Sequence, residues 1–368
     1  MAQNLYLITF RNQITFDMKT KQTFTKRLRL AILITMTSLY FSAASASDGL
    51  LMTNPSQEGI NAKSFYSVTV DDNNTKWFLT ELGIVSFDGE KWSLIPNASQ
   101  DIELRDIVFD STIDDTGFWI ASSAGIASLK SLTEGEGMVL FTTENSTLLS
   151  NSGQKIAVGA NGTRWFSTDE GVTAYKDGKW FNPTYDDLYP AMLFEAFPIT
   201  AIVSSPTGDT LMIASAGAGV ARIVKSRRDV DAIVGASEYA IWGPIILPSD
   251  NIQSAHVTKT GEKWFGTELG IAKHTGDDTL DNWTVWSTDQ GLINNFVQAI
   301  TSDDDGNIWF GTPTGLSMFD GTKFTNYTKE NGLSGDNIQC LILDKEGVVW
   351  IGTDEGVNSF SNGTLTSY

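Results

Sequence analysis

The chain has 368 residues and a formal net charge of −19, with 44 acidic against 25 basic residues. Nucleic acid is therefore excluded as a partner, because binding phosphates needs a clustered basic surface. Hydrophobic residues make up 41% of the chain, which excludes wholesale disorder. The single cysteine, Cys340, excludes a disulfide framework within the chain.

Residues 1–46 have the pattern of a signal peptide. Six basic residues and one acidic residue precede an apolar run from Leu30 to Phe41. Twelve mainly apolar residues are too few to cross a bilayer, which takes about 20 in a helix. The small residues Ala44-Ser45-Ala46 then predict cleavage after Ala46. The alternatives are an uncleaved anchor and a true start at Met18, which begins a more compact basic region.

Residues 47–368 form the predicted exported part, which is more acidic than the whole. It holds 19 basic against 43 acidic residues, a formal charge of −24. No lipoprotein-type cysteine follows the apolar run, so a lipid anchor is not expected. No transmembrane segment is expected in the mature chain either. The expected location is periplasmic or secreted, in a bacterium.

A repeat runs through the whole exported part. Six copies share a Trp, a Ser or Thr three residues later and a Gly six residues later, and these copies lie at 77–84, 119–126, 165–172, 264–271, 309–316 and 350–357. A degenerate seventh copy lies at 211–220, where Met212 replaces the Trp and one residue is inserted before Gly219. With Met212 included, the six intervals from Trp77 to Trp350 average 45.5 residues.

Each unit is predicted to contain four short strands. In the sixth unit the strand-length runs are 297–303, 307–312, 315–321 and 323–328. Asp and Gly turn signals separate the runs, and no helical period is present, so the fold class is all-β.

Seven such units predict a single seven-bladed β-propeller over residues 47–368. A four-stranded sheet that is apolar on both faces must pack between two like neighbours, and a ring gives every sheet two. The recurring aromatic residues are predicted to wedge between blades, and these are Trp77, Trp119, Trp165, Trp264, Trp309 and Trp350. The Gly six residues after each Trp permits the turn into the third strand.

Two segments compete to complete the last blade. Thr364 to Tyr368 has the length and pattern of that blade's own fourth strand. Residues 50–55 precede the first unit at the position of an outer strand, and they are the alternative. The sequence does not decide between the two.

The motif D-x-x-G-x-x-W-[FI]-G-T-x-x-G-[LV], followed by F-D-G, F-x-x-Y and N-G-L, resembles the two-component regulator propeller repeat. Residues 303–333 carry the whole pattern. The fourth unit is weakest, with a polar and basic excursion at 223–237. The resemblance implies an extracytoplasmic sensing role in bacterial signalling. Because no kinase follows before Tyr368, signalling is expected to need a separate membrane protein.

One rim of the ring is expected to bind the ligand, because the second-to-third turns and fourth-to-first connections emerge there. The acidic candidates in those turns are Glu81, Asp169, Glu170, Glu268, Asp354 and Glu355. They attract cations or basic surfaces, or else are merely solvated turn residues. The amide candidates before the first strands are Asn61, Asn251, Asn295 and Asn337. They bind sugars or else cap turns.

The fifth unit suggests an enzymatic alternative. His256 lies on its first strand, His274 on its third, and Glu268 lies between them in sequence. Streptogramin lyase, also a propeller, uses histidines and a glutamate, but its sequence motif is not matched here. The alternative function is therefore a lyase or hydrolase with a site near His256 and Glu268.

Other chemistry is poorly supported. The turn at Asp303 approximates a sialidase Asp-box and part of a calcium loop, but it lacks the terminal bidentate Glu. Cys340 is expected to be a buried packing residue. The basic spot around Arg227 and Arg228 is expected to be a solvated loop. No metal or cofactor is predicted.

These patterns together predict an exported, non-catalytic recognition propeller of the sensor type. Its expected ligand is a glycan or a protein bound at one rim. A structural role in a surface assembly is a third hypothesis.

Overall fold

Each repeat unit folds into one antiparallel sheet of four strands that are hydrogen-bonded in chain order. In the sixth unit these are β21 (Ala299–Ser302), β22 (Ile308–Thr312), β23 (Gly315–Phe319) and β24 (Phe324–Tyr327). The second strand is buried along its whole length, because it has a neighbouring strand on both edges and a neighbouring sheet on both faces.

The computed structural model describes residues 61–97, 99, 101–111, 117–132, 138–182, 198–208, 210–224, 241–242, 247–275 and 282–368. The predicted signal peptide, residues 50–55 and the basic spot at Arg227 and Arg228 lie outside these residues.

The remaining six sheets follow the same order. The first contains β1 (Phe65–Val70), β2 (Lys76–Thr80), β3 (Gly83–Phe87) and β4 (Trp92–Pro96). The second contains β5 (Leu104–Phe109), β6 (Phe118–Ser122), β7 (Gly125–Leu129) and β8 (Val139–Phe141). The third contains β9 (Gly153–Val158), β10 (Arg164–Thr168), β11 (Gly171–Lys176) and β12 (Lys179–Phe181).

The fourth contains β13 (Ile199–Ser204), β14 (Thr210–Ser215), β15 (Gly219–Val224) and β16 (Ile241–Trp242). The fifth contains β17 (Ile252–Val257), β18 (Lys263–Thr267), β19 (Ile271–His274) and β20 (Trp283–Trp286). The seventh contains β25 (Ile338–Leu343), β26 (Val349–Thr353), β27 (Val357–Ser361) and β28 (Thr364–Ser367). Two 3-10 turns, η2 (Thr288–Gln290) and η3 (Lys329–Asn331), lie in connections between blades.

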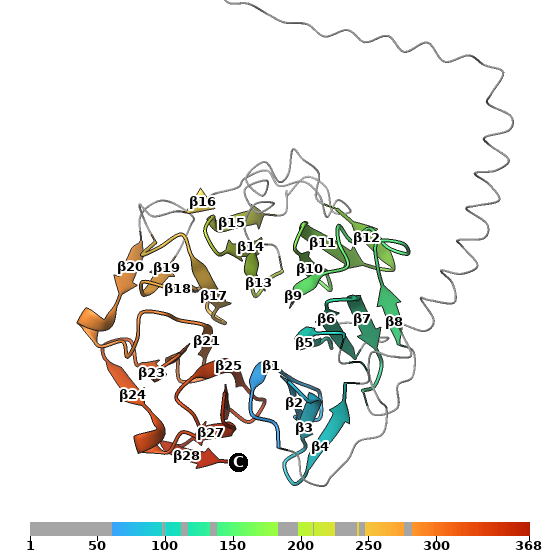
Figure 1. The fold of residues 1–368 in the computed structure, drawn as a ribbon. Coiled ribbons are helices and arrows are strands. Elements are labelled where there is room, and N and C mark those ends of the chain that lie inside the picture. The colour runs from blue at the N-terminus through green and yellow to red at the C-terminus, as the bar shows by residue number, and fades with distance from the viewer. Residues whose placement is uncertain are drawn as a thin grey trace, which may run out of the picture. The chain divides into compact units, whose positions relative to one another are not determined.

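The seven sheets are the blades of a closed ring (Figure 1). The first strand of each blade lies innermost and contacts the first strand of the next blade, and β25 contacts β1 in the same way. The predicted seven-bladed propeller is confirmed, including the degenerate fourth unit.

The recurring Trp packs each blade onto the next, as the sequence predicts. All six are at most 8% exposed. The ring centroids of Trp119 in the second blade and Phe166 in the third lie 5.0 Å apart. Those of Trp264 in the fifth blade and Phe310 in the sixth lie 5.6 Å apart. In the fourth blade Met212 takes this position and packs in a core cluster with Phe265 of the fifth. An unbranched thioether fills the same space without a ring.

The Asp that precedes the Trp by six residues holds both the turn and the indole. Asp303 Oδ1 accepts hydrogen bonds from the backbone amides of Asp305 and Asn307, and its Oδ2 accepts one from Trp309 Nε1 at 2.8 Å. Asp71 serves Trp77 and Asp344 serves Trp350 in the same way. In these three blades the motif therefore satisfies the one polar atom of the buried wedge, whereas the buried indole nitrogens of Trp119 and Trp264 have no such Asp partner.

The Ser or Thr and the Gly of the motif build the second-to-third turn. In the sixth blade Thr312 Oγ1 donates to the carbonyl of Gly315 at 2.7 Å. Gly315 has a φ of 144°, and a Cβ there would lie 2.7 Å from the Tyr327 carbonyl oxygen. Only glycine permits this conformation and this approach of the fourth strand.

The last blade has its own fourth strand, β28, which pairs with β27. The seventh and first blades then meet side by side. Lys76 Nζ lies 3.1 Å from Asp344 Oδ2, with both side chains buried, and 4.9 Å from the ring centroid of Trp350. Phe78 of the first blade packs with Trp350 of the seventh in one hydrophobic cluster. Whether residues 50–55 add to this blade stays a prediction.

We predict that Trp309→Ala lowers the free energy of unfolding by about 3–5 kcal/mol, because it removes a buried wedge and leaves a cavity between two blades. Urea unfolding measures this change. Val285→Ala, at a position that is 50% exposed, is the control and should change stability by about 0.5 kcal/mol or less. Equal losses in both variants would contradict the wedge.

The contact between Asp344 and Lys76 predicts an acid-dependent stability. Burial alone raises the pKa of the Asp344 carboxyl, but hydrogen bonds from Trp350, the Val348 amide and Lys76 outweigh it and hold the pKa below 3.8. The unfolded chain therefore binds this proton first, and stability is lost as pH falls below about 4.

Asp344→Asn should be less stable at pH 7 by about 3–5 kcal/mol, since it leaves Lys76 buried without its counter-ion. The loss between pH 7 and pH 3 should be smaller in the variant than in the natural protein. Asp72→Asn removes an exposed ion pair with Lys345 across the same two blades, and it should cost under about 1 kcal/mol. Denaturant unfolding at pH 7 and pH 3 measures the free energy of unfolding of each protein. An equal loss of stability with pH in Asp344→Asn and in the natural protein would overturn the prediction.

Candidate functional site

The predicted rim exists, because second-to-third turns and fourth-to-first connections lie side by side. Glu81, in the turn after β2, accepts hydrogen bonds from the backbone amides of Lys63 and Ser64, which precede β1. Glu268, in the turn after β18, accepts from Ser249 Oγ and from Asn251 Nδ2. These two carboxylates therefore fix the connection that enters their own blade.

The other rim candidates divide between capping and exposure. Asn295 Oδ1 accepts from the backbone amide of Thr288, and Asn337 Oδ1 accepts from Gln298. Glu355 pairs with Lys329 at 2.6 Å. The remaining candidates are Asn61, Asp169 and Glu170, which are exposed, and Asp354, which is partly buried. Asn295 thus caps a backbone amide, whereas Asn251 and Asn337 bond to the side chains of Glu268, Gln253 and Gln298.

A β-bulge near the start of most inner strands turns one side chain toward the channel mouth. Pairing with the second strand shifts register there in six blades. A bulge re-aims a side chain in this way. The residues at this strand position, or just before β21 in the sixth blade, are Tyr66, Arg105, Gln154, Thr200, Gln253, Gln298 and Gln339.

Several of these side chains bridge to the next inner strand. Thr200 Oγ1 donates to the Ile252 carbonyl at 2.7 Å, and Gln339 Oε1 accepts from the Phe65 amide at 2.9 Å, which links the last blade to the first. This ring of polar bridges satisfies backbone groups at the channel mouth.

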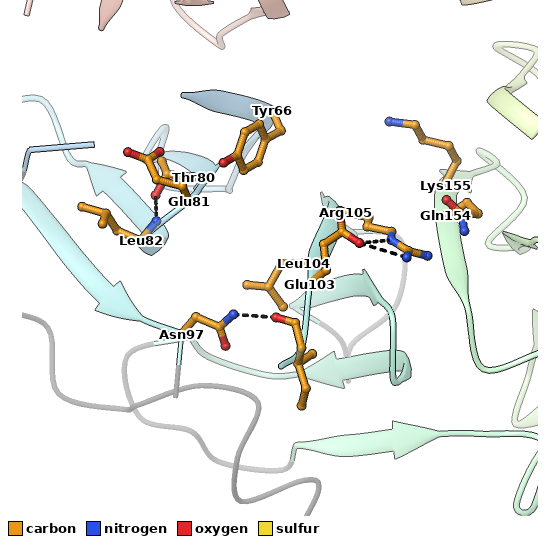
Figure 2. A pocket seen from close by; sticks show the side chains of 11 residues that line it. Tyr66, Thr80, Glu81, Leu82, Asn97, Glu103, Leu104, Arg105, Gln154 and Lys155 are labelled. Atoms are coloured by element: carbon orange, nitrogen blue, oxygen red, sulfur yellow. Dashed lines mark hydrogen bonds and ion pairs between the residues drawn. The ribbon is translucent and has the colours of Figure 1, made fainter. Parts of the chain in front are cut away.

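A cavity of about 690 Å³ opens at this rim over the first three blades (Figure 2). Its size lies within the range of small-molecule sites. The lining residues are Tyr66, Thr80, Glu81, Leu82, Asn97, Ile102, Glu103, Leu104, Arg105, Gln154 and Lys155. We name it the rim cavity.

Charges of both signs line the rim cavity. Arg105 makes two hydrogen bonds to Glu103 Oε2, at 2.9 and 3.1 Å, and a third to Ser152 Oγ at 2.8 Å. Tyr66 is 39% exposed. Its burial, followed by the nearby charges of Glu81 and Glu103, raises the pKa of its phenol. Tyr66 is therefore a neutral hydrogen-bonding aromatic at neutral pH.

A second cavity of about 240 Å³ is the mouth of the central channel. All seven inner strands line it. Its polar side chains include Thr200, Gln253, Gln298 and Gln339, and its charged ones are Asp106 and Lys155. Asp106 is buried and accepts from Ser67 Oγ at 2.7 Å and from the Ile156 amide at 2.9 Å.

The structure does not bring His256 and Glu268 together. His256 pairs with Trp264 near the start of β18, while Glu268 follows the end of that strand. Glu268 lies four residues beyond Trp264, and four residues of extended strand span about 13 Å. His256 Nε2 instead contacts Ser302 Oγ of the next blade at 2.9 Å. His274 is fully buried against Trp283. The arrangement assumed in the enzymatic alternative is therefore absent.

We predict that His256 titrates far below a catalytic range, because burial lowers its pKa to about 4. The unfolded histidine, near 6.5, binds its proton first, so this group costs stability as pH falls from about 6.5 to 4. Proton NMR titration measures the pKa directly, and His274→Gln assigns the signals because the chain has only 2 histidines. A measured pKa near 7 would contradict the burial argument and reopen the general-base role.

No cluster of three or more potential metal ligands occurs among the described residues. Cys340 is buried, and its thiol donates to the Phe65 carbonyl at 3.0 Å. Burial raises the pKa of Cys340 to about 12, so the thiol stays protonated. No helix in the described part of the chain is long and apolar enough to cross a membrane.

Comparison with protein families confirms the repeat. Residues 291–314 and 332–355 match the two component regulator propeller family. These segments cover the entries into the sixth and seventh blades and their second-to-third turns, where the sequence motif is strongest. A comparison with curated protein sequences finds no match.

Solved structures show the same fold at low identity. The extracellular domain of the hybrid two component system BT3049 from B. thetaiotaomicron has a TM-score of 0.67 and 20% identity, over 83% of this chain and 40% of that one. A streptogramin B lyase has a TM-score of 0.61 and 15% identity, over 86% and 97%. PorZ, a surface component of the type-IX secretion system of Porphyromonas gingivalis, has a TM-score of 0.61 and 16% identity, over 81% of this chain and 46% of that one. This chain thus spans less than half of the BT3049 and PorZ structures.

Sequence reasoning identified Glu81 but missed most of the rim cavity. Tyr66, Arg105, Gln154 and Lys155 lie on first strands rather than in turns. One signal was present in the sequence, since the second residue of the first strand is polar in six units and the polar Gln298 lies just before β21 in the sixth.

Proposed function

We propose that this protein is an exported, non-catalytic recognition propeller that binds a glycan in the rim cavity. The observation that carries the proposal is the exposed Tyr66 ring, placed among amides, carboxylates and a guanidinium in a cavity of about 690 Å³. A sugar presents C–H groups on its ring faces and hydroxyls around its edge. An aromatic face with hydrogen-bonding groups around it complements both.

The mixed lining of the rim cavity, with polar and charged groups beside Leu82, Ile102 and Leu104, supports a glycan over a protein ligand. Leu82 and Leu269 are exposed on second-to-third turns, but they belong to the first and fifth blades and form no common patch in the rim cavity. Protein interfaces are centred on larger apolar or aromatic areas. Tyr66 is the only aromatic residue in the described lining of the rim cavity.

The separation of His256 from Glu268 supports recognition without catalysis. His256 contacts Ser302 at the opposite end of the blade from the rim, and Glu268 is held by Ser249 and Asn251. The likeness to streptogramin B lyase extends to the fold alone at 15% identity.

The extracytoplasmic location rests on the basic and apolar pattern of residues 1–46. The match to the two component regulator propeller family supports a sensing role. Binding would then be passed to a separate membrane signalling protein.

We predict that one class of oligosaccharide raises the melting temperature of the purified protein in a saturable way. At a concentration of about 100 Kd, binding to the native state alone adds about 2.7 kcal/mol, which is a shift of several degrees. Tyr66→Ala should weaken binding at least about tenfold in isothermal titration calorimetry, because it removes the aromatic face.

Leu269→Ala is the matched control, at an exposed position on the same rim but on the fifth blade, and should leave affinity unchanged. If no oligosaccharide changes the melting temperature, the glycan proposal fails. If a sugar binds equally well to Tyr66→Ala, the rim cavity is the wrong site.

A further inference from the structure

Two residues line both the rim cavity and the channel mouth. They are Tyr66, on the first blade, and Lys155, on the third. In Figure 2 the Lys155 side chain extends from its strand into the space on the side where Tyr66 lies. Tyr66 and Lys155 therefore border both cavities, and a ligand lying against Tyr66 would lie next to the channel mouth.

The Lys155 ammonium has no carboxylate within ion-pair distance among the described residues. Arg105 is already paired with Glu103, and Asp106 is held by Ser67 and the Ile156 amide. Because Lys155 is partly buried, its charge is screened less than that of a surface lysine. The site thus contains a positive charge that no described carboxylate pairs with, in a protein of net charge −19.

The charge of Lys155 acts across the channel. It lowers the pKa of the Cys340 thiol on the seventh blade, although burial, the larger effect, raises it. Asp106 opposes this influence of Lys155 from the second blade. Besides Asp106, the channel mouth is lined by Thr200, by the amides Gln253, Gln298 and Gln339, and by apolar side chains, so Lys155 is the one cation of the described lining that an anion there would meet.

The size of the channel mouth limits what can enter it. Its volume of about 240 Å³ lies below the range for drug-sized ligands, which suits one sugar ring at the end of a chain. The surrounding rim is acidic, with Glu81, Glu103, Asp169 and Glu170 on the first three blades. A polyanion would be repelled by these charges, whereas a single carboxylate beside Lys155 would be attracted.

We propose that the channel mouth binds the carboxylate of one terminal uronic acid residue, with Lys155 as its counter-ion and the rest of the glycan in the rim cavity against Tyr66. This inference rests on the proposed function, because it names the sugar class that the same site prefers.

The test uses monosaccharide pairs that differ only at C6: glucuronate and glucose, galacturonate and galactose, mannuronate and mannose. Ligand-observed NMR with the purified protein measures the weak affinities that single sugars give. At least one uronate should bind about tenfold more tightly than its neutral partner, and the preference should weaken as salt is added. Polygalacturonate, tested alongside, should bind no better than its monomer.

Lys155→Gln should abolish the preference for the uronate over its neutral partner, because it removes the counter-ion of the carboxylate. Lys155→Arg keeps the charge and should retain part of the preference for the uronate. That result would show that substitution at this position leaves the site folded. Lys179→Gln is the matched control, since it removes an exposed lysine from the outer strand of the same blade. It should bind like the natural protein.

The outcomes separate the two proposals. Neutral sugars that bind as well as uronates, with dependence on Tyr66, would overturn the carboxylate site and leave glycan recognition intact. A uronate preference that survives Lys155→Gln would also overturn it. Binding of no sugar, neutral or acidic, would overturn both proposals.

Discussion

The packing of one blade onto the next is the constraint on which the whole molecule depends. Each sheet is apolar on both faces, so no blade buries its core alone, and the Trp of one blade completes the core of its neighbour. Because the Trp has a polar nitrogen, Asp71, Asp303 and Asp344 are needed to accept its hydrogen bond in three of the blades. The repeated motif is therefore the set of residues that one such contact requires.

Closure of the ring imposes a further condition at one place. The seventh and first blades are far apart in sequence, yet they meet through a buried Lys76–Asp344 contact and a shared aromatic cluster. A buried ion pair gives little net stability over an apolar pair, but it strongly disfavours any arrangement that leaves either charge alone. We infer that this pair helps to fix which blades meet at the closure.

The same architecture creates the candidate site. Register shifts at the start of the inner strands direct polar side chains toward the channel mouth, where most of them bridge neighbouring blades. Tyr66 and Lys155 differ from these, since they line both the rim cavity and the channel mouth. The residues that hold the ring together and the residues offered to a ligand thus lie on the same strands.

The sequence by itself determined the fold, because the local signals recur from unit to unit: strand-length runs, turn signals, and a buried aromatic at one position in six of the seven units. It also identified Met212 as the substitute for the missing Trp. It did not determine the site, since turn carboxylates such as Glu268 were equally consistent with binding and capping. Only the tertiary structure brought Tyr66, Arg105 and Lys155 together, because three blades separated by about 40 to 50 residues of sequence meet at one rim only when the ring closes.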